Sequence, residues 1–234
     1  MPWASLYRSG DSDWRTVVSV ATSSDSRSLA RLAMRFRLLI EGPIPPRKQA
    51  TLAQIHAIRR RLHHQMQRLW RHAPLQDKQH WLRLTPPVPN DIAILEDRAG
   101  RHFAPLISQK NATHCSLNVV FLKSEYPNTL ISVRGDIDNR LKTLFDALRV
   151  PSVSEIQQVE PVAQEGENPL YCVMQDDGLI TGLSVETDRL PTSDGQHDVF
   201  AVATITLHGS RLTWTELLMG VAVSRNRFFV LPPS

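Results

Sequence analysis

The chain has 234 residues and a formal net charge of +4 with neutral histidines, and 41% of its residues are apolar. This composition is typical of a globular protein and excludes a mainly disordered chain. No run approaches the ~18–20 apolar residues of a membrane-spanning helix, and the first residues lack the apolar segment of a secretory signal. The two cysteines, Cys115 and Cys172, have no metal-ligand spacing. We therefore expect a cytoplasmic protein that does not contact membranes.

The predicted elements begin after a serine-rich leader. Residues 1–33 show no sustained period, whereas the sequence from Met34, MRFRLLIEG, predicts a strand over 34–41. The prolines of the following GPIPPRK require a rigid turn. Apolar residues then recur at steps of three and four over residues 51–70, which predicts an amphipathic helix. A short second helix is predicted at 75–84.

The middle of the chain alternates between strand and helix patterns. Residues 88–112 have no clear period and are predicted to be irregular. Residues 113–124 and 130–135 are rich in β-branched and apolar residues, and they predict two strands of an antiparallel hairpin. Residues 139–149 predict a helix, whose buried side would carry Leu141, Leu144, Phe145 and Leu148.

The last third of the chain predicts a loop followed by strands. Residues 151–169 are polar and contain proline, which predicts an exposed loop, and residues 177–189 and 197–209 alternate like strands. This order of elements predicts an α+β fold with a single mixed, largely antiparallel sheet packed against helices. The predicted organisation is a leader at 1–33, a folded domain at 34–210 with a helical block at about 49–83, and a tail at 211–234.

Basic residues are concentrated in the predicted first helix. No acidic residue occurs between Glu41 and Asp77. A block of one sign predicts a surface that faces phosphates, while a solvated helix face balanced by acids elsewhere is an equal alternative. The histidines of this block lack the spacing of a zinc site, so solvated or helix-capping roles are expected. The block contains Arg47, Lys48, His56, Arg59, Arg60, Arg61, His63, His64, Arg68, Arg71 and His72.

The stretch GDIDNRLKTLFDALR, at residues 135–149, places Asp136 and Asp138 directly ahead of a helix. At the end of a strand, residues i and i+2 project to the same side. Carboxylates ~5 Å apart would repel by roughly 3 kcal/mol at an effective dielectric constant of ~20. A hard cation such as Mg²⁺, which prefers oxygen ligands, would remove this repulsion. Lys142 lies one helical turn after Asp138 and would point back toward the same site.

A helix cap is the alternative for the same residues. A capping Asp contributes ~1 kcal/mol, and Lys142 can equally be a solvated helix residue. Asp176 and Asp177 form a second acidic pair directly before a predicted strand. Either one can be a turn residue, or it can supply a third metal ligand to the site of Asp136 and Asp138.

The combined pattern resembles the RusA family of Holliday-junction resolvases. It reads D-I-D-N-x-x-K-x-x-x-D-A-L from Asp136 to Leu148, and D-D-x-x-I from Asp176 to Ile180. The sequence LLIEGPIPPRK is also similar to the family's early strand and proline-rich turn. The resemblance covers roughly residues 34–43 and 113–208.

This chain is about twice as long as members of that family. The helical block at 49–83 and the loop at 150–172 look like insertions. Gly135 stands where a basic residue usually precedes the first aspartate, with Arg134 one position earlier. Specificity for four-way junctions depends on dimer geometry and DNA-contacting loops, so the resemblance supports the metal site more directly than the junction specificity.

The resemblance implies roles for individual residues. Asp136, Asp138 and Asp177 match aspartates that bind Mg²⁺, with Mn²⁺ as a substitute, and Lys142 matches a lysine needed for catalysis. Asp176 would orient a ligand or join the coordination shell. The family is a homodimer of small α+β subunits that cleaves four-way DNA junctions with paired nicks.

These observations lead to a hypothesis and two alternatives. We expect a metal-dependent, structure-selective endonuclease that acts on branched DNA as a homodimer. A nucleic-acid-binding module on a resolvase-like fold that cuts nothing is the alternative from another class, and RNA is the alternative substrate. Retention of all the carboxylates together with Lys142 favours the enzyme. The candidate phosphate-contacting residues are Arg47, Lys48, Arg59, Arg60, Arg134 and Arg140.

Overall fold

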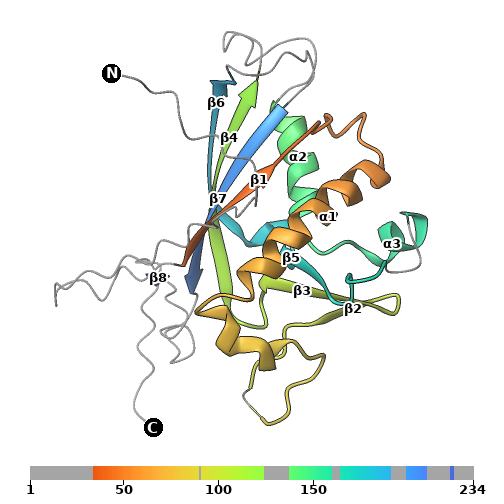
Figure 1. Cartoon of the computed structure of the whole chain (residues 1–234), viewed down its shortest axis with the longest axis vertical. Helices are drawn as coiled ribbons and strands as arrows, with labels where there is room; N and C mark the ends of the chain where they lie inside the picture. The colour runs from red at the N-terminus through yellow and green to blue at the C-terminus, as the bar shows by residue number, and fades with distance from the viewer. Residues whose placement is uncertain are drawn as a thin grey trace, which may run out of the picture.

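The computed structural model describes residues 34–89, 91–123, 137–159, 164–190, 199–209 and 222–223. The larger of its two sheets has β7 and β4 at the centre, each paired on both sides (Figure 1). β7 is antiparallel to β1 and β4, whereas β4 is parallel to β6. A short strand, β8, pairs with the end of β7. The strands are β1 (Arg35–Ile40), β7 (Val199–Gly209), β4 (Thr113–Lys123), β6 (Ile180–Arg189) and β8 (Ala222–Val223).

The strands predicted at 34–41, 113–124, 177–189 and 197–209 are confirmed as β1, β4, β6 and β7. The segment 130–135, the predicted leader 1–33 and the predicted tail apart from residues 222–223 lie outside the described residues. β6 and β7, although consecutive in the chain, lie on opposite sides of β4 rather than next to each other. The α+β class is therefore confirmed.

The described residues form two sheets rather than the single sheet predicted from the sequence, and the second sheet is smaller. It consists of β2 (Glu96–Arg98), β3 (Arg101–Ile107) and β5 (Leu170–Met174), with β3 antiparallel to β2 and parallel to β5. Two of its strands fall in the segment 88–112 that was predicted to be irregular. β3 is buried on both faces along most of its length, and such a strand shows no alternation.

The turn between β2 and β3 explains why the hairpin was missed. Arg98 and Arg101 are paired across it, and the two residues between them, Ala99 and Gly100, have positive φ values of 54° and 76°. Two positive φ values match the right-handed twist of the flanking strands. Alanine rarely adopts this conformation, so the sequence carries no obvious turn signal.

The first predicted helix is confirmed as α1 (Leu52–Leu69), and the short second one as the 3₁₀ helix η1 (Leu75–Trp81). α1 begins with a capping box, because the Thr51 hydroxyl accepts from the Gln54 N–H and the Gln54 side chain accepts from the Thr51 N–H. These bonds satisfy two donors that a helix start otherwise leaves unpaired. Among the described residues, no helix has the length and apolar character that spanning a bilayer requires.

Two further helices follow β4 in the chain. α2 (Ile137–Leu148) confirms the predicted helix, with Leu141, Leu144 and Leu148 buried and Phe145 partly buried. α3 (Val153–Val159) lies in the segment 151–169, which was predicted to be an exposed loop. Of its three apolar residues, Val153, Ile156 and Val159, only Ile156 is buried, and a segment of seven residues is shorter than the window over which a helical period can be recognised.

The main core lies between the larger sheet and the helices α1 and α2 (Figure 1). β1 contributes Phe36, Leu38 and Ile40, and β4 contributes alternating residues on the same face. Burial of this face fixes the register of each strand, because a shift of one residue would turn its apolar side chains outward.

Helix α1 also covers the outer edge of β1. The Gln65 side chain accepts from the Leu39 N–H at 3.0 Å and donates to the Leu39 carbonyl at 2.7 Å. An edge strand leaves such backbone groups unpaired on one side. Gln65 therefore takes the place of a neighbouring strand, and it fixes α1 alongside β1 (Figure 1).

Candidate functional site

The start of α2 carries two of the predicted catalytic residues. Asp138 lies in the first turn, and its Oδ2 atom is 2.5 Å from the Nζ atom of Lys142, one turn further on. The Asp138 side chain is 60% exposed and that of Lys142 is 56% exposed. The pair is therefore accessible to a ligand, and it is held mainly by the helical spacing of its two residues.

The turn after β1 holds the start of α2 in place. The Arg47 N–H donates to the Asn139 carbonyl at 2.9 Å. In the opposite direction, the Arg140 guanidinium donates to the Ile44 carbonyl. These bonds join the proline-rich turn, which the sequence resemblance includes, to the helix that carries Asp138.

Asp176 and Asp177 lie at the short 3₁₀ helix η3 (Asp177–Leu179), directly before β6. The Asp176 carboxylate caps η3 by accepting from the Gly178 N–H at 2.8 Å. Asp177 is exposed, and within the described residues its carboxylate makes no hydrogen bond or ion pair. η3 contacts both α2 and β4, so the fold brings Asp177 to the helix that carries Asp138 and Lys142.

The predicted metal ligands are only partly covered by the structure. Asp136 and Arg134 lie outside the described residues. Within the described ranges, no three Asp, Glu, His or Cys side chains form a group that could hold a metal ion. Asp138 and Asp177 are both exposed, and the elements that carry them, α2 and η3, are in contact.

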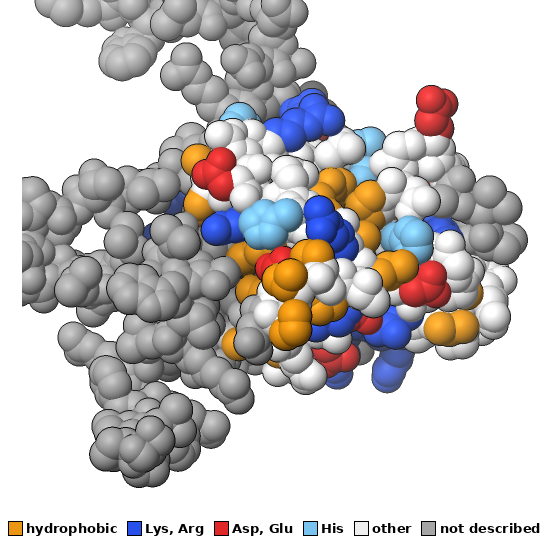
Figure 2. Space-filling model, turned by 90° about the horizontal axis from the view of Figure 1, so that it is seen from below, with side chains coloured by type: hydrophobic (Ala, Val, Ile, Leu, Met, Phe, Trp, Pro, Cys, Tyr) orange, Lys and Arg blue, Asp and Glu red, His pale blue; other side chains and the backbone are white. Residues whose placement is uncertain are grey.

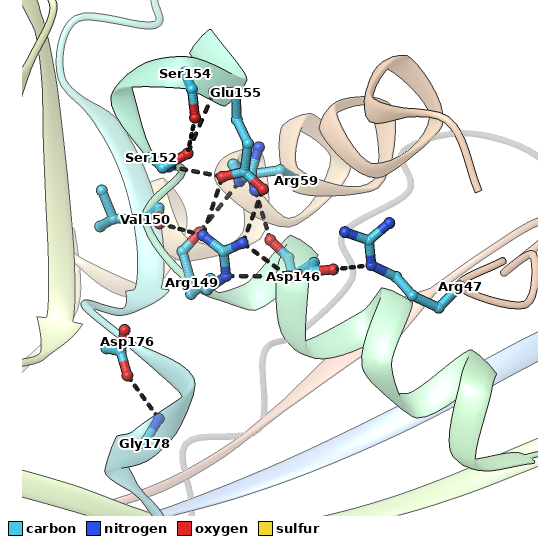
Figure 3. Close-up of polar contacts among 10 residues, drawn as sticks. All are labelled: Arg47, Arg59, Asp146, Arg149, Val150, Ser152, Ser154, Glu155, Asp176 and Gly178. Atoms are coloured by element: carbon cyan, nitrogen blue, oxygen red, sulfur yellow. Dashed lines mark hydrogen bonds and ion pairs between the residues drawn. The ribbon is translucent and has the colours of Figure 1, made fainter.

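The other end of α2 is a dense network of charges (Figure 3). The Arg149 guanidinium binds the carboxylates of Asp146 and Glu155, each at 2.8 Å. Arg47 binds the second oxygen of Asp146 at 2.6 Å. Arg59 reaches from α1 and donates to the backbone carbonyls of Asp146 and Arg149, which are carbonyls that the end of a helix otherwise leaves unpaired.

Burial and pairing shift the pKa values in this network. Burial alone would raise the pKa of Glu155, but its hydrogen bonds with Arg149 and Ser152 outweigh burial and lower it. Burial lowers the pKa of Arg59, which is only 3% exposed. Glu155 stays ionised because Arg149 and the Ser152 N–H stabilise its charge.

The predicted phosphate-contacting residues have unequal exposure. Lys48 is exposed, and Arg47 is 40% exposed but paired with Asp146. Arg59 is buried, so its guanidinium does not face solvent. Arg60 is 22% exposed and pairs with Glu167 at 2.5 Å. Of these four cations, only Lys48 is exposed and has no acidic partner among the described residues.

Two of the three histidines of α1 differ from the expectation of solvated or capping side chains. His56 is 3% exposed, and burial lowers its pKa to about 4. His63 is 2% exposed, and its Nδ1 atom accepts from the Tyr171 N–H at 3.0 Å. Both therefore belong to the interior, whereas His64 is exposed.

The sequence analysis did not single out two exposed arginines of β1. Arg35 and Arg37 alternate with buried residues in the pattern RFRLLI and face away from the core. Their alternation with apolar residues could have shown that they share one face of the strand, because strand residues two apart point to the same side. Their relation to the arginines of α1 is known only from the structure, in which α1 lies along the edge of β1.

Comparison of the chain with models of protein families, with curated proteins and with solved structures found no match.

Proposed function

We propose that this protein is a Mg²⁺-dependent, structure-selective endonuclease that hydrolyses phosphodiester bonds in branched DNA. The proposal includes a RusA-like fold, a homodimer and a cytoplasmic location. One observation carries it. Asp138, Lys142 and Asp177, which match the metal-binding and catalytic positions of RusA resolvases, are exposed on two elements that contact each other.

The chemistry of the side chains fits a hard divalent cation. Asp138 and Asp177 offer carboxylate oxygens, the ligand type that Mg²⁺ prefers, and Asp136 precedes α2 by one residue. A bound Mg²⁺ would polarise the scissile phosphate and lower the pKa of an attacking water. Asp138, Asp177 and Asp136 would hold the ion.

The remaining parts of the site would stabilise charge on the phosphate or position a metal ligand. Lys142 is held beside Asp138, where its ammonium can stabilise the negative charge that develops on the phosphate or on the leaving oxygen. The N-terminus of α2 adds the partial positive charge of its unpaired N–H groups. Asp176 caps η3 and thereby orients the following residue, Asp177.

The test is cleavage of labelled four-way, forked and plain duplex DNA, with Mg²⁺ and with EDTA. The Asp138→Asn variant should lose cleavage by at least about 100-fold, the scale of losing a transition-state electrostatic contact, while still binding DNA. Asp77→Asn is the matched control, because Asp77 is an exposed acid in the first turn of η1. Cleavage that survives in EDTA or in Asp138→Asn would contradict the proposal.

The substrate panel distinguishes the parts of the proposal. Paired nicks in the four-way junction would support a resolvase. Cleavage of forks or plain duplex instead would keep the metal chemistry and reject junction specificity. Tight binding without cleavage by the wild type would favour the binding module.

Asp176→Asn separates capping from metal binding at η3. Asparagine caps as well as aspartate does, since its side-chain oxygen can still accept from the Gly178 N–H. If Asp176 acts only by capping η3, the variant should cleave at close to the wild-type rate. A loss as large as that of Asp138→Asn would instead make Asp176 a metal ligand.

A further inference from the structure

Helix α1 and strand β1 run side by side, and one row of helix residues follows the edge of the strand. Arg61 donates to the Glu41 carbonyl, and Gln65 binds both backbone groups of Leu39. Each step of four helix residues is matched by two strand residues in the opposite direction, because both advance ~6 Å. Beyond Gln65 the exposed side of α1 continues with Arg68, three residues on, while β1 continues in the opposite direction with Arg37, two residues before Leu39.

Five exposed arginines lie on or next to these two neighbouring elements, and we call this set the basic strip. Arg61, Arg68 and Arg71 are exposed on or just after α1, and Arg35 and Arg37 are exposed on the outer face of β1. Neither α1 nor β1 contains an acidic residue. Among the described residues, none of the five arginines forms an ion pair.

Gly42 makes room for one end of the basic strip. Its φ is +88°, and a Cβ atom at this position would lie 2.9 Å from the Nη1 atom of Arg61. A larger residue would displace the Arg61 guanidinium from this position and would also be strained at this φ. The glycine of the proline-rich turn therefore positions a cation as well as turning the chain.

Basic and acidic side chains are interspersed on the face of the molecule seen in Figure 2. The arginines of the basic strip have no acidic residue within their own elements, β1 and α1. A polyanion would gain a favourable contact at each arginine that it reaches.

We propose that the basic strip binds the phosphate backbone of one duplex arm of the DNA substrate. Six residues of β1 span roughly 17–20 Å, and one DNA strand carries a phosphate every ~3.4 Å along the axis. The strip can therefore follow about five phosphates of one strand. Its Arg61 end adjoins the turn that is bonded to the start of α2, so the bound arm would lead to the candidate active site.

This inference rests on the proposed function for the identity of the polyanion, and its test uses binding rather than cleavage. Fluorescence anisotropy of a labelled four-way junction in EDTA gives the affinity at salt concentrations from about 50 to 200 mM. The test variant is Arg37→Gln/Arg68→Gln. The control, Arg83→Gln/Arg98→Gln, removes the same charge from the segment after η1 and from β2.

Each lost phosphate contact lowers the slope of log affinity against log salt by about 0.9. The strip variant should therefore lose about 2 from the slope and bind roughly 60-fold more weakly at ~0.1 M salt. The control should change the slope by less than half as much. Both side chains replaced in the strip are exposed, and circular dichroism before and after heating checks that the fold is retained.

The outcomes separate this inference from the proposed function. Three outcomes would each contradict DNA binding by the basic strip. They are an unchanged slope in the strip variant, an equal change of slope in the control, and no DNA binding by the wild type. An unchanged slope together with Asp138-dependent cleavage would reject the strip and leave the nuclease standing. If the strip variant has a smaller slope but the wild type cleaves none of the substrates, DNA binding by the strip would be supported and the proposed nuclease activity would be contradicted.

Discussion

The two ends of α2 carry similar residues in different environments. At the first turn, Asp138 pairs with Lys142 and with no other part of the chain that the structure describes, and both side chains are more than half exposed. At the last turn, the Asp146 side chain is 14% exposed and binds both Arg149 and Arg47. Asp138 therefore keeps oxygens available for a ligand, whereas the carboxylate of Asp146 is used within the protein. The same type of residue serves candidate chemistry at one end and structure at the other.

The difference has an energetic basis. An exposed ion pair one helical turn apart contributes about 0.3–0.5 kcal/mol. A buried cation that loses its partners costs several times more, because water does not replace them. Substitutions at the two ends of α2 should therefore separate stability from activity.

The largest stability effect is expected for Arg59→Met, which keeps an apolar side chain of similar length. Arg59 donates to the carbonyls of Asp146 and Arg149, so the variant leaves two helix-end acceptors unpaired. The free energy of unfolding should fall by about 3 kcal/mol, at 1–3 kcal/mol for each buried polar group left unpaired. Urea denaturation measures this change, and a loss below about 1 kcal/mol would show that this end of α2 does not depend on Arg59.

A smaller effect, which depends on pH, is expected at the neighbouring His56. Its Nδ1 atom is 3.1 Å from the Arg59 guanidinium, and burial lowers its pKa from 6.5 to about 4. Below pH 6.5 the unfolded chain gains a proton at His56 that the folded chain does not accept until about pH 4. Stability from this group is therefore complete above pH 6.5 and is lost as the pH falls toward 4.

His56→Asn, whose side-chain oxygen can still accept from Arg59, should abolish this contribution. Between pH 7.5 and pH 5, the wild type should lose about 2 kcal/mol more than the variant. Urea denaturation of both proteins at the two pH values measures the difference. Equal losses would mean that His56 is not neutral in the folded state.

The smallest stability effect is expected at the exposed end of α2. Lys142→Gln removes one surface ion pair, so the free energy of unfolding should change by no more than about 0.5 kcal/mol. Cleavage should nevertheless fall by about 100-fold or more if Lys142 acts in the transition state. A stability loss that accounts for the lost cleavage would place Lys142 in the framework of the protein instead.

The sequence predicted the elements whose pattern is local. The apolar stripes of α1 and α2 and the alternation in β1 and β6 were sufficient to predict them, and the spacing of Asp138 and Lys142 correctly indicated a facing pair. The β2–β3 hairpin was missed because its turn places an alanine at positive φ. The second sheet was missed because β3 and β5 are joined across a long separation in the chain.

The burial and the binding partners of the basic residues could not be predicted from the local sequence pattern. Arg59 lies next to the apolar stripe of α1, but its partners come from residues 146 and 149, far along the chain. Its burial follows from how α1 packs on α2. The proximity of Arg35 and Arg37 to other arginines likewise follows from packing, because the side of α1 that carries Arg61 covers the edge of β1.

The central claim is that Asp138 of α2 and Asp177 of η3 serve one site. The most direct test is the single-turnover rate of four-way junction cleavage in Mg²⁺ by Asp138→Asn, Asp177→Asn and the double variant. If the two carboxylates hold one metal ion, each single variant should lose about as much activity as the double variant, because residues that act as a unit are not additive. Losses that multiply in the double variant, or a wild-type rate in either single variant, would contradict the claim.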